Sequence, residues 1–119
     1  MRGEWSIVFF VDERDREPVR EFLSLLDIET QVRFDWSIEQ LRIRNVLAGE
    51  PLVRHLEGKI WELRREGRGQ IYRLLYAMLS GRRVLLLHGF EKKTQRTPRA
   101  EVETAVHRLA SFVQREGGE

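Results

Sequence analysis

The pattern of apolar and polar positions predicts short strands and helices in alternation. Residues 5–11 are rich in β-branched and aromatic side chains, which is typical of a strand. Pro18 suits the first turn of a helix, and apolar residues recur at helical spacing over 19–26. Three further strand-like runs cover residues 59–65, 70–79 and 82–90. The gaps between these three runs have the length and glycine content of hairpin turns, so the runs predict an antiparallel meander.

Residues 28–48 fit two kinds of element. Val32 to Ile38 alternate between apolar and polar side chains, which is the period of a strand. The segment is nevertheless long and lacks internal glycine or proline, and Asp27 and Gly49 suit the two ends of a helix. Such a helix would bury a face made of Ile28, Val32, Trp36, Ile43 and Leu47. The pattern leaves the strand open and slightly favours the helix.

The rest of the chain completes a single α+β domain over residues 1–119. Residues 49–58, which contain Pro51, are predicted to form a connecting loop. Thr97 and Pro98 are predicted to cap and open a last helix, and residues 115–119 to form a frayed tail. The predicted order is β-α-α-β-β-β-α, with helices packed against a mostly antiparallel, twisted sheet.

Composition narrows the possible classes of protein. The 119 residues include no cysteine, which excludes disulfides, thiolate metal sites and a cysteine nucleophile, and fits a reducing, cytoplasmic location. No apolar run approaches the roughly 18 residues of a membrane span, and the first residues do not resemble a signal peptide. The three histidines lack metal-ligand spacing, so we expect neither a metal nor another cofactor.

Charge is distributed unevenly along the chain. The net charge is only +2, but residues 59–99 hold 11 basic and 3 acidic residues, a local net charge of +8. A basic segment within an otherwise acidic chain indicates a phosphate-bearing partner, because arginine binds phosphate with two parallel hydrogen bonds. A solvated surface would give the same pattern, and charge alone does not decide between them.

Two residues within the predicted strands have alternative interpretations. Arg73 lies among apolar residues, so it either forms an ion pair with Glu62 on the neighbouring strand or binds phosphate beside Arg64. His88 is predicted to share a strand face with Val84, Leu86 and Phe90. A lone histidine there is more often a hydrogen-bonded core residue than a catalytic one.

Lys92, Lys93 and Thr94 follow the last predicted strand. Adjacent ammonium groups repel each other, which lowers the pKa of each lysine, and an anion between them relieves the repulsion. The hydroxyls of Thr94 and Thr97 and the start of the last helix would add hydrogen-bond donors. The segment is therefore predicted to favour phosphate.

Several motifs together resemble a known family. They are Glu17-Pro18-Val19, His55-Leu56-Glu57-Gly58, Trp61-Glu62-Leu63-Arg64, Ile71-Tyr72-Arg73, and His88-Gly89-Phe90-Glu91-Lys92-Lys93-Thr94-Gln95 with Thr97-Pro98. In this order they resemble the phage-derived branch of the RelE/HigB toxins, over about residues 5–112. The resemblance implies a RelE-like fold with a helix over 28–48. It further implies a ribosome-dependent mRNA endoribonuclease of a type II toxin–antitoxin module, neutralised by a small partner that often carries a helix-turn-helix domain.

The implied chemistry is attack by the RNA's own 2′-hydroxyl on the adjacent phosphorus, without metal or protein nucleophile. By resemblance, Arg64 and Arg73 bind the phosphate, while Lys92 and Lys93 stabilise the transition state and could protonate the leaving oxygen. Additional phosphate contacts are expected from Lys59, Arg65, Arg68, Thr94 and Arg96. The general base stays open: His88 is the histidine at hand, Glu62 has neighbours that should lower its pKa, and the ribosome is a third source.

Two other functions fit the same residues. A toxin of this fold could instead bind and inhibit gyrase, or the chain could be a non-catalytic RNA-binding regulator. The clustered cations favour the ribonuclease over the gyrase inhibitor. Because acidic segments flank the basic one, a carboxylate-bearing strand or helix of an antitoxin could cover the cleft.

Overall fold

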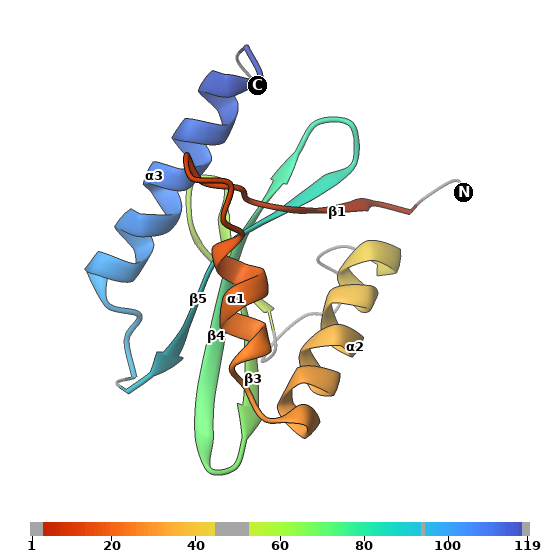
Figure 1. Cartoon of the computed structure of the whole chain (residues 1–119), viewed down its shortest axis with the longest axis vertical. Helices are drawn as coiled ribbons and strands as arrows, with labels where there is room; N and C mark the ends of the chain where they lie inside the picture. The colour runs from red at the N-terminus through yellow and green to blue at the C-terminus, as the bar shows by residue number, and fades with distance from the viewer. Residues whose placement is uncertain (1–3, 45–52, 94, 118–119) are drawn as a thin grey trace.

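The computed structural model describes residues 4–44, 53–93 and 95–117 (Figure 1). The elements in chain order are β1 (Ser6–Phe9), α1 (Pro18–Ser24), α2 (Ile28–Arg44), β2 (Val53–Glu57), β3 (Ile60–Gly67), β4 (Gln70–Leu79), β5 (Arg83–Lys92) and α3 (Arg99–Arg115). The fold is α+β, as the pattern predicted, and the segment from residue 28 is helical. Residues 45–52, which include the predicted helix end at Gly49, lie outside the described part.

The five strands form one mixed sheet in the order β1-β5-β4-β3-β2. All pairings are antiparallel except that of β1, which runs parallel to β5. The prediction of a loop over 49–58 was wrong for Val53–Glu57, which forms the edge strand β2. This strand pairs only with β3, and a bulge between His55 and Glu57 interrupts its alternation, so it carries little of the apolar signal of a central strand.

Helices cover both faces of the sheet (Figure 1). α1 and α2 pack on one face, where Val19 and Phe34 meet Leu74 and Tyr76. α3 packs on the other face, where Ala105 lies in a second apolar cluster. Glycine at position 89 permits the close approach of α1, because a Cβ there would lie 2.2 Å from the ring of Phe22.

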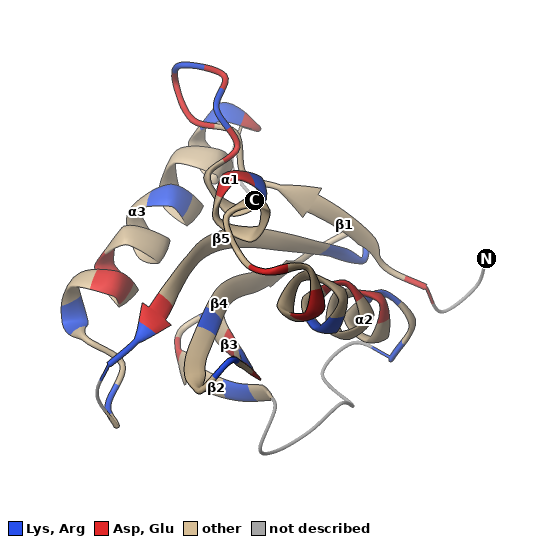
Figure 2. Ribbon diagram, turned by 60° about the horizontal axis from the view of Figure 1, so that its bottom comes forward, with Lys and Arg blue, Asp and Glu red and all other residues tan. Residues whose placement is uncertain are grey.

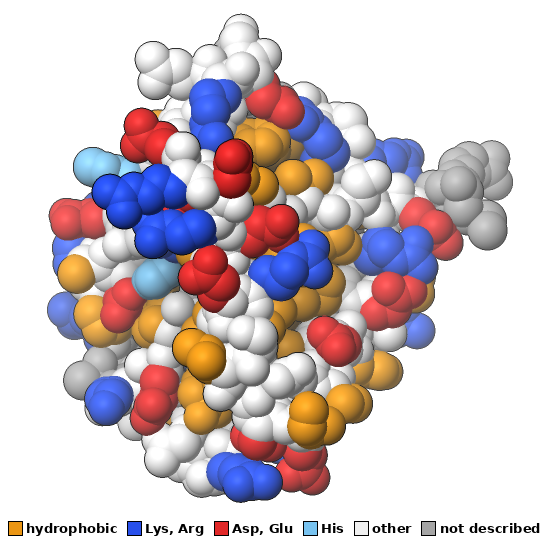
Figure 3. Space-filling view, viewed as in Figure 1, with side chains coloured by type: hydrophobic (Ala, Val, Ile, Leu, Met, Phe, Trp, Pro, Cys, Tyr) orange, Lys and Arg blue, Asp and Glu red, His pale blue; other side chains and the backbone are white. Residues whose placement is uncertain are grey.

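The buried face of α2 is not the one that the sequence predicted. The buried residues are Thr30, Phe34, Ser37, Ile38 and Leu41. The predicted face points to solvent instead: Trp36 is 56% exposed, and hydrophobic side chains stand among charged ones on the side formed by α1 and α2 (Figure 3). The helix carries apolar residues on both sides, and the contact of Thr30 with Gly67 selects the buried side. Asp27 caps the helix as predicted, accepting a hydrogen bond from the Thr30 amide.

A bulge in the β4–β5 pairing changes which side chains of β5 share a face. Tyr76 lies opposite Leu86 and Leu75 lies opposite His88, so Leu87 is the extra residue. Strict alternation had placed His88 with Leu86, and that prediction was wrong. Beyond the bulge, His88 and Phe90 lie on the α3 side of the sheet.

The start of α3 also differs from the prediction. Pro98 is the capping residue, and Thr97 makes no capping hydrogen bond. The hydroxyl of Thr97 instead donates to Glu62 on β3 at 2.8 Å. The linker between β5 and α3 is therefore fastened to the sheet, and this attachment shapes the site described next.

Candidate phosphate-binding site

Four predicted phosphate-binding cations line one hollow on the α3 side of the sheet. The hollow has a volume of about 400 Å³ and is lined by Arg64, Ile71, Arg73, Lys92, Lys93 and Gln95. These residues come from β3, β4, the end of β5 and the linker that follows it. In Figure 2, the basic positions of β2, β3 and β4 lie near the basic end of β5, toward the lower left of the view. The four cations therefore lie around one hollow.

Strand register explains how the hollow forms. The tight turn after Gly67 places Arg64 directly opposite Arg73, and the next hairpin places Ile71 opposite Lys92. Like charges directly opposite each other on a sheet are destabilising, so this arrangement needs a neighbouring carboxylate. Glu62 supplies one, because it points to the same face as Arg64 two residues earlier on β3.

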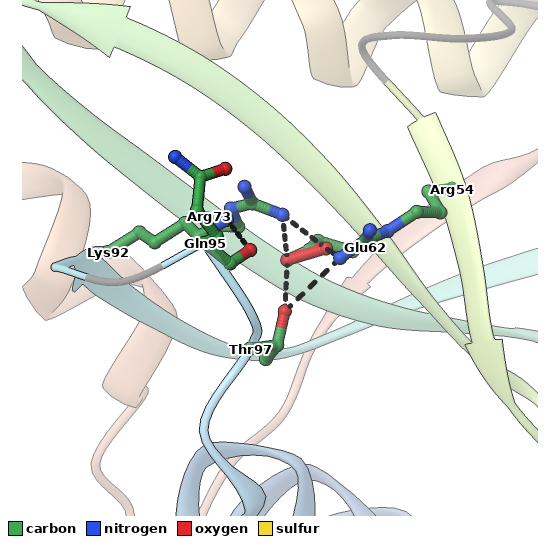
Figure 4. A network of polar contacts seen from close by, with 6 residues as sticks. All are labelled: Arg54, Glu62, Arg73, Lys92, Gln95 and Thr97. Atoms are coloured by element: carbon green, nitrogen blue, oxygen red, sulfur yellow. Dashed lines mark hydrogen bonds and ion pairs between the residues drawn. The ribbon is translucent and has the colours of Figure 1, made fainter.

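Glu62 is the centre of a buried polar network (Figure 4). Its side chain is 1% exposed, and Nη1 of Arg73 donates to both carboxylate oxygens at 2.6 Å. Arg54 of β2 and Thr97 of the linker donate to the same carboxylate at 2.8 Å each. The ion-pair interpretation of Arg73 is thus confirmed, and Arg73 nevertheless also lines the hollow.

The carboxyl of Glu62 is held ionised by these donors. Burial alone would raise its pKa, but the hydrogen bonds from Arg73 and Thr97 and the positive charge of Arg73 outweigh burial and lower the pKa. A carboxylate that accepts hydrogen bonds from three residues has no free lone pair for a substrate proton. Glu62 therefore suits a structural role better than that of a general base.

Lys92 is a cation of the hollow whose pKa is lowered by its surroundings. Its ammonium donates to the carbonyl oxygen of Gln95, which folds the linker back over the end of β5. Burial and the positive charge of Arg73 lower the pKa of Lys92, and Glu62 offsets only part of this effect. The sequence analysis attributed a lowered pKa to repulsion between Lys92 and Lys93. In the structure, the cations that lower the pKa of Lys92 lie on other strands.

Comparison with known proteins shows the family to which the chain belongs. Residues 21–110 match the family described as phage derived protein Gp49-like (DUF891). The chain belongs to the Gp49-like family. This family is part of the RelE/ParE-like toxin superfamily, which agrees with the resemblance at the coarser level. No curated protein is detectably similar to the chain in sequence.

His88 of the Gp49-like protein lies under α3 rather than in the hollow. Its Nε2 pairs with Glu101 at 2.5 Å, and its Nδ1 accepts a hydrogen bond from Arg108 at 3.2 Å. Arginine can only donate, so Nδ1 is unprotonated and the ring is neutral. Burial lowers the pKa of His88 further than Glu101 raises it. The structure supports the interpretation of His88 as a hydrogen-bonded core residue.

Three other predicted phosphate contacts lie away from the hollow. Lys59 is in the turn between β2 and β3, at the far end of β3. Arg65 points to the opposite face of the sheet, where burial and then the charge of Arg33 lower its pKa. Arg68 is in the β3–β4 turn and pairs with Asp27 at 3.5 Å. Adjacent positions on a strand face opposite sides, which separates Arg65 from Arg64.

The two remaining predicted contacts are in the linker. Thr94 lies outside the described residues. Arg96 belongs to a second hollow, which is lined by Arg54, His55, Leu56, Glu57, Arg96, Thr97, Arg99 and Val102. The sequence analysis missed Arg54, because its role depends on the unrecognised strand β2, whose register places it opposite Glu62.

Within residues 4–44, 53–93 and 95–117, no group of three or more histidine, aspartate or glutamate side chains is arranged to hold a metal ion. None of the helices in these ranges is long and apolar enough to cross a membrane.

Proposed function

We propose that this Gp49-like protein is the toxin of a type II toxin–antitoxin module and that it cleaves mRNA on the ribosome. The observation that carries the proposal is the convergence of Arg64, Arg73, Lys92 and Lys93 on one hollow. A phosphodiester is the anion that such a set of donors suits, because guanidinium forks match pairs of phosphate oxygens. Membership in a family of the RelE/ParE-like toxin superfamily supports the same function.

The reaction is a transfer within the RNA itself. The 2′-oxygen bonds to the adjacent phosphorus, the bond to the 5′-oxygen breaks, and a cyclic phosphate remains on the upstream fragment. A base takes the proton of the 2′-hydroxyl and an acid gives one to the 5′-oxygen. The cations stabilise the negative charge that grows on the phosphate oxygens in the transition state.

Lys92 is the best candidate for the acid. An ammonium with a lowered pKa gives up its proton more readily near neutral pH than an exposed lysine does. Its contact with the Gln95 carbonyl shows that Nζ donates toward the linker side of the hollow. A substrate phosphate would take the place of that carbonyl.

The described lining residues of the hollow are cations, an amide and Ile71, so we assign no base to them. We expect the ribosome to complete the site, and cleavage of free RNA to be much slower than cleavage of ribosome-bound message. The antitoxin is expected to be a small protein, often with a helix-turn-helix domain, whose carboxylates cover the hollow. With a ribosome-bound substrate, we expect the protein to act in the cytoplasm.

The test is cleavage of a defined message in a purified translation system, mapped by primer extension and by detection of the cyclic phosphate. The double variant Lys92→Met/Lys93→Met should cleave about 10²-fold more slowly or worse, as loss of other transition-state donors does. The double variant Arg14→Gln/Arg20→Gln is the charge-matched control, because Arg14 lies in the exposed turn between β1 and α1 and Arg20 is exposed on α1. It should leave the rate unchanged.

Three results would overturn the proposal. One is an unchanged cleavage rate in the double lysine variant. Another is wild-type protein that leaves ribosome-bound message intact. The third is a message that stays intact while purified gyrase is inhibited, which would identify the gyrase-binding alternative.

A further inference from the structure

The second hollow adjoins the first across the Glu62 network. Its volume is about 460 Å³, and it receives basic side chains from three elements: Arg54 from β2, Arg96 from the linker and Arg99 from the start of α3. In Figure 4, Arg54 reaches Glu62 from one side, and Arg73 and Lys92 lie on the other. One carboxylate thus separates two groups of cations.

The lining of the second hollow suits an anion. Three arginines line it, together with the carboxylate of Glu57. Arg54 also pairs with the buried Glu62 at 2.8 Å, and Arg99 with Glu103 at 3.4 Å. Arg99 pairs with Glu57 at 2.5 Å, but its side chain is 60% exposed. Such exposed pairs contribute little to stability, so a phosphate can replace the carboxylate at small cost. A phosphate also gains the bidentate geometry that arginine offers.

The two hollows are close enough to share one strand of RNA. Arg54 and Arg73 stand on β2 and β4, which flank β3 in the sheet. Strands lie about 4.8 Å apart, so these backbones are separated by about 10 Å. An extended RNA strand covers that distance within a few nucleotides. The linker that carries Arg96 and Thr97 lies at the boundary of the two hollows.

We propose that the second hollow binds a backbone phosphate that flanks the cleaved one on the same RNA strand, through Arg54, Arg96 and Arg99. This inference rests on the proposed function, since it takes single-stranded RNA as the substrate. It adds a contact that positions the strand without taking part in the chemistry. Binding there should depend on RNA length and on salt.

The experiment measures equilibrium binding of 2′-O-methyl RNA, which cannot be cleaved, as a dinucleotide and as a hexanucleotide over a range of salt concentrations. For the hexanucleotide, Arg96→Gln/Arg99→Gln should reduce the slope of log K against log salt by about 0.7, since the double variant removes one single-strand phosphate contact. The dissociation constant at 0.1 M salt should rise about fivefold, which is that change of slope taken over the tenfold range of salt below 1 M. Binding of the dinucleotide should be unchanged.

Arg14→Gln/Arg20→Gln is the matched control. Arg20 is 62% exposed and pairs with Glu17 at 2.6 Å, so it resembles Arg99 in exposure and pairing but lies on α1, across the sheet. Thermal melts should show that all variants are folded. Replacing Arg99 removes a cation from the first turn of a helix, where a positive charge is unfavourable, so stability should not fall.

The outcomes separate this inference from the proposed function. If Lys92→Met/Lys93→Met weakens hexanucleotide binding and the arginine pair has no effect, the second subsite is wrong and the first hollow stands. If the arginine pair weakens both RNA lengths equally, those residues act at the first hollow and the flanking subsite is wrong. If neither pair changes binding, both proposals fail.

Discussion

Glu62→Gln is the substitution for which the structure makes the sharpest prediction about stability. Glutamine has nearly the same shape, so the change removes the charge and one acceptor rather than the packing. Four hydrogen bonds reach the two carboxylate oxygens, from Arg73, Arg54 and Thr97. If the new amide group takes the Oε2 position, Thr97 can reverse its hydroxyl and accept, but one of the two bonds from Arg73 is lost.

The expected loss of stability is about 3–5 kcal/mol, the range found when one partner of a buried ion pair is removed. Arg73 justifies the full range, because its side chain is only 7% exposed and its Nε already has no hydrogen-bond partner within the described residues. For a chain of this size each kcal/mol lowers the melting temperature by about 4 °C, so the variant should melt about 12–20 °C lower. Glu29→Gln, at an exposed helical pair, should change stability by less than about 0.5 kcal/mol.

The same network predicts how stability depends on pH. The folded-state pKa of Glu62 is lowered, so its contribution is complete above the ordinary glutamate pKa of about 4.3 and is lost as pH falls through the lower folded-state value. Urea denaturation at a series of pH values should show a smaller acid loss in Glu62→Gln than in the wild type. A variant that melts within about 4 °C of wild type, with the same acid loss, would refute the network as a source of stability.

Four further substitutions test the packing and the cap of α2. Phe34→Ala should lower the free energy of unfolding by about 3–5 kcal/mol in urea melts, whereas Trp36→Ala, on the exposed side of α2, should lower it far less. Similar losses in the two variants would mean that the wrong face of α2 was assigned as buried. Gly89→Ala should cost about 1–3 kcal/mol, because its methyl group meets the Phe22 ring, and an unchanged melting temperature would contradict that contact. Asp27→Ala should cost about 1 kcal/mol through loss of the α2 cap, measured in the same way.

Local signals predicted the meander well, because the turns that join β3 to β4 and β4 to β5 both contain glycine. The prediction of 70–79 agrees with β4, Gln70–Leu79. The same turn fixes the register, so the opposition of Arg64 and Arg73 follows from hairpin geometry once Gly67 is paired with Gln70. The relative position of Arg64 and Arg73, two of the four cations, can therefore be predicted from local sequence.

Two kinds of feature were harder to predict: which face of a helix or strand points inward, and which residues far apart in the sequence are in contact. Periodicity identified α2 as amphipathic but could not choose between two apolar sides, because the choice depends on where Gly67 allows Thr30 to approach. An extra residue at Leu87 shifted the alternation of β5, and the glycine in this strand, Gly89, comes two residues after the shift. Arg54 and Thr97 reach Glu62 from segments 8 and 35 residues away in sequence, and no spacing rule connects them.

A buried carboxylate beneath the proposed phosphate site resolves a conflict between folding and binding. Arg64, Arg73, Lys92 and Lys93 line the same hollow, and cations at this spacing repel each other in the free protein. Glu62 pairs with Arg73 at 2.6 Å from the buried side, and Glu66 pairs with Arg64 at 3.1 Å. The lining retains the charges of Lys92 and Lys93. Because the carboxylate of Glu62 is sealed from solvent, it does not meet an incoming phosphate directly. The same group fastens the linker through Thr97, so protonation of Glu62 would loosen the fold and the boundary of both hollows together.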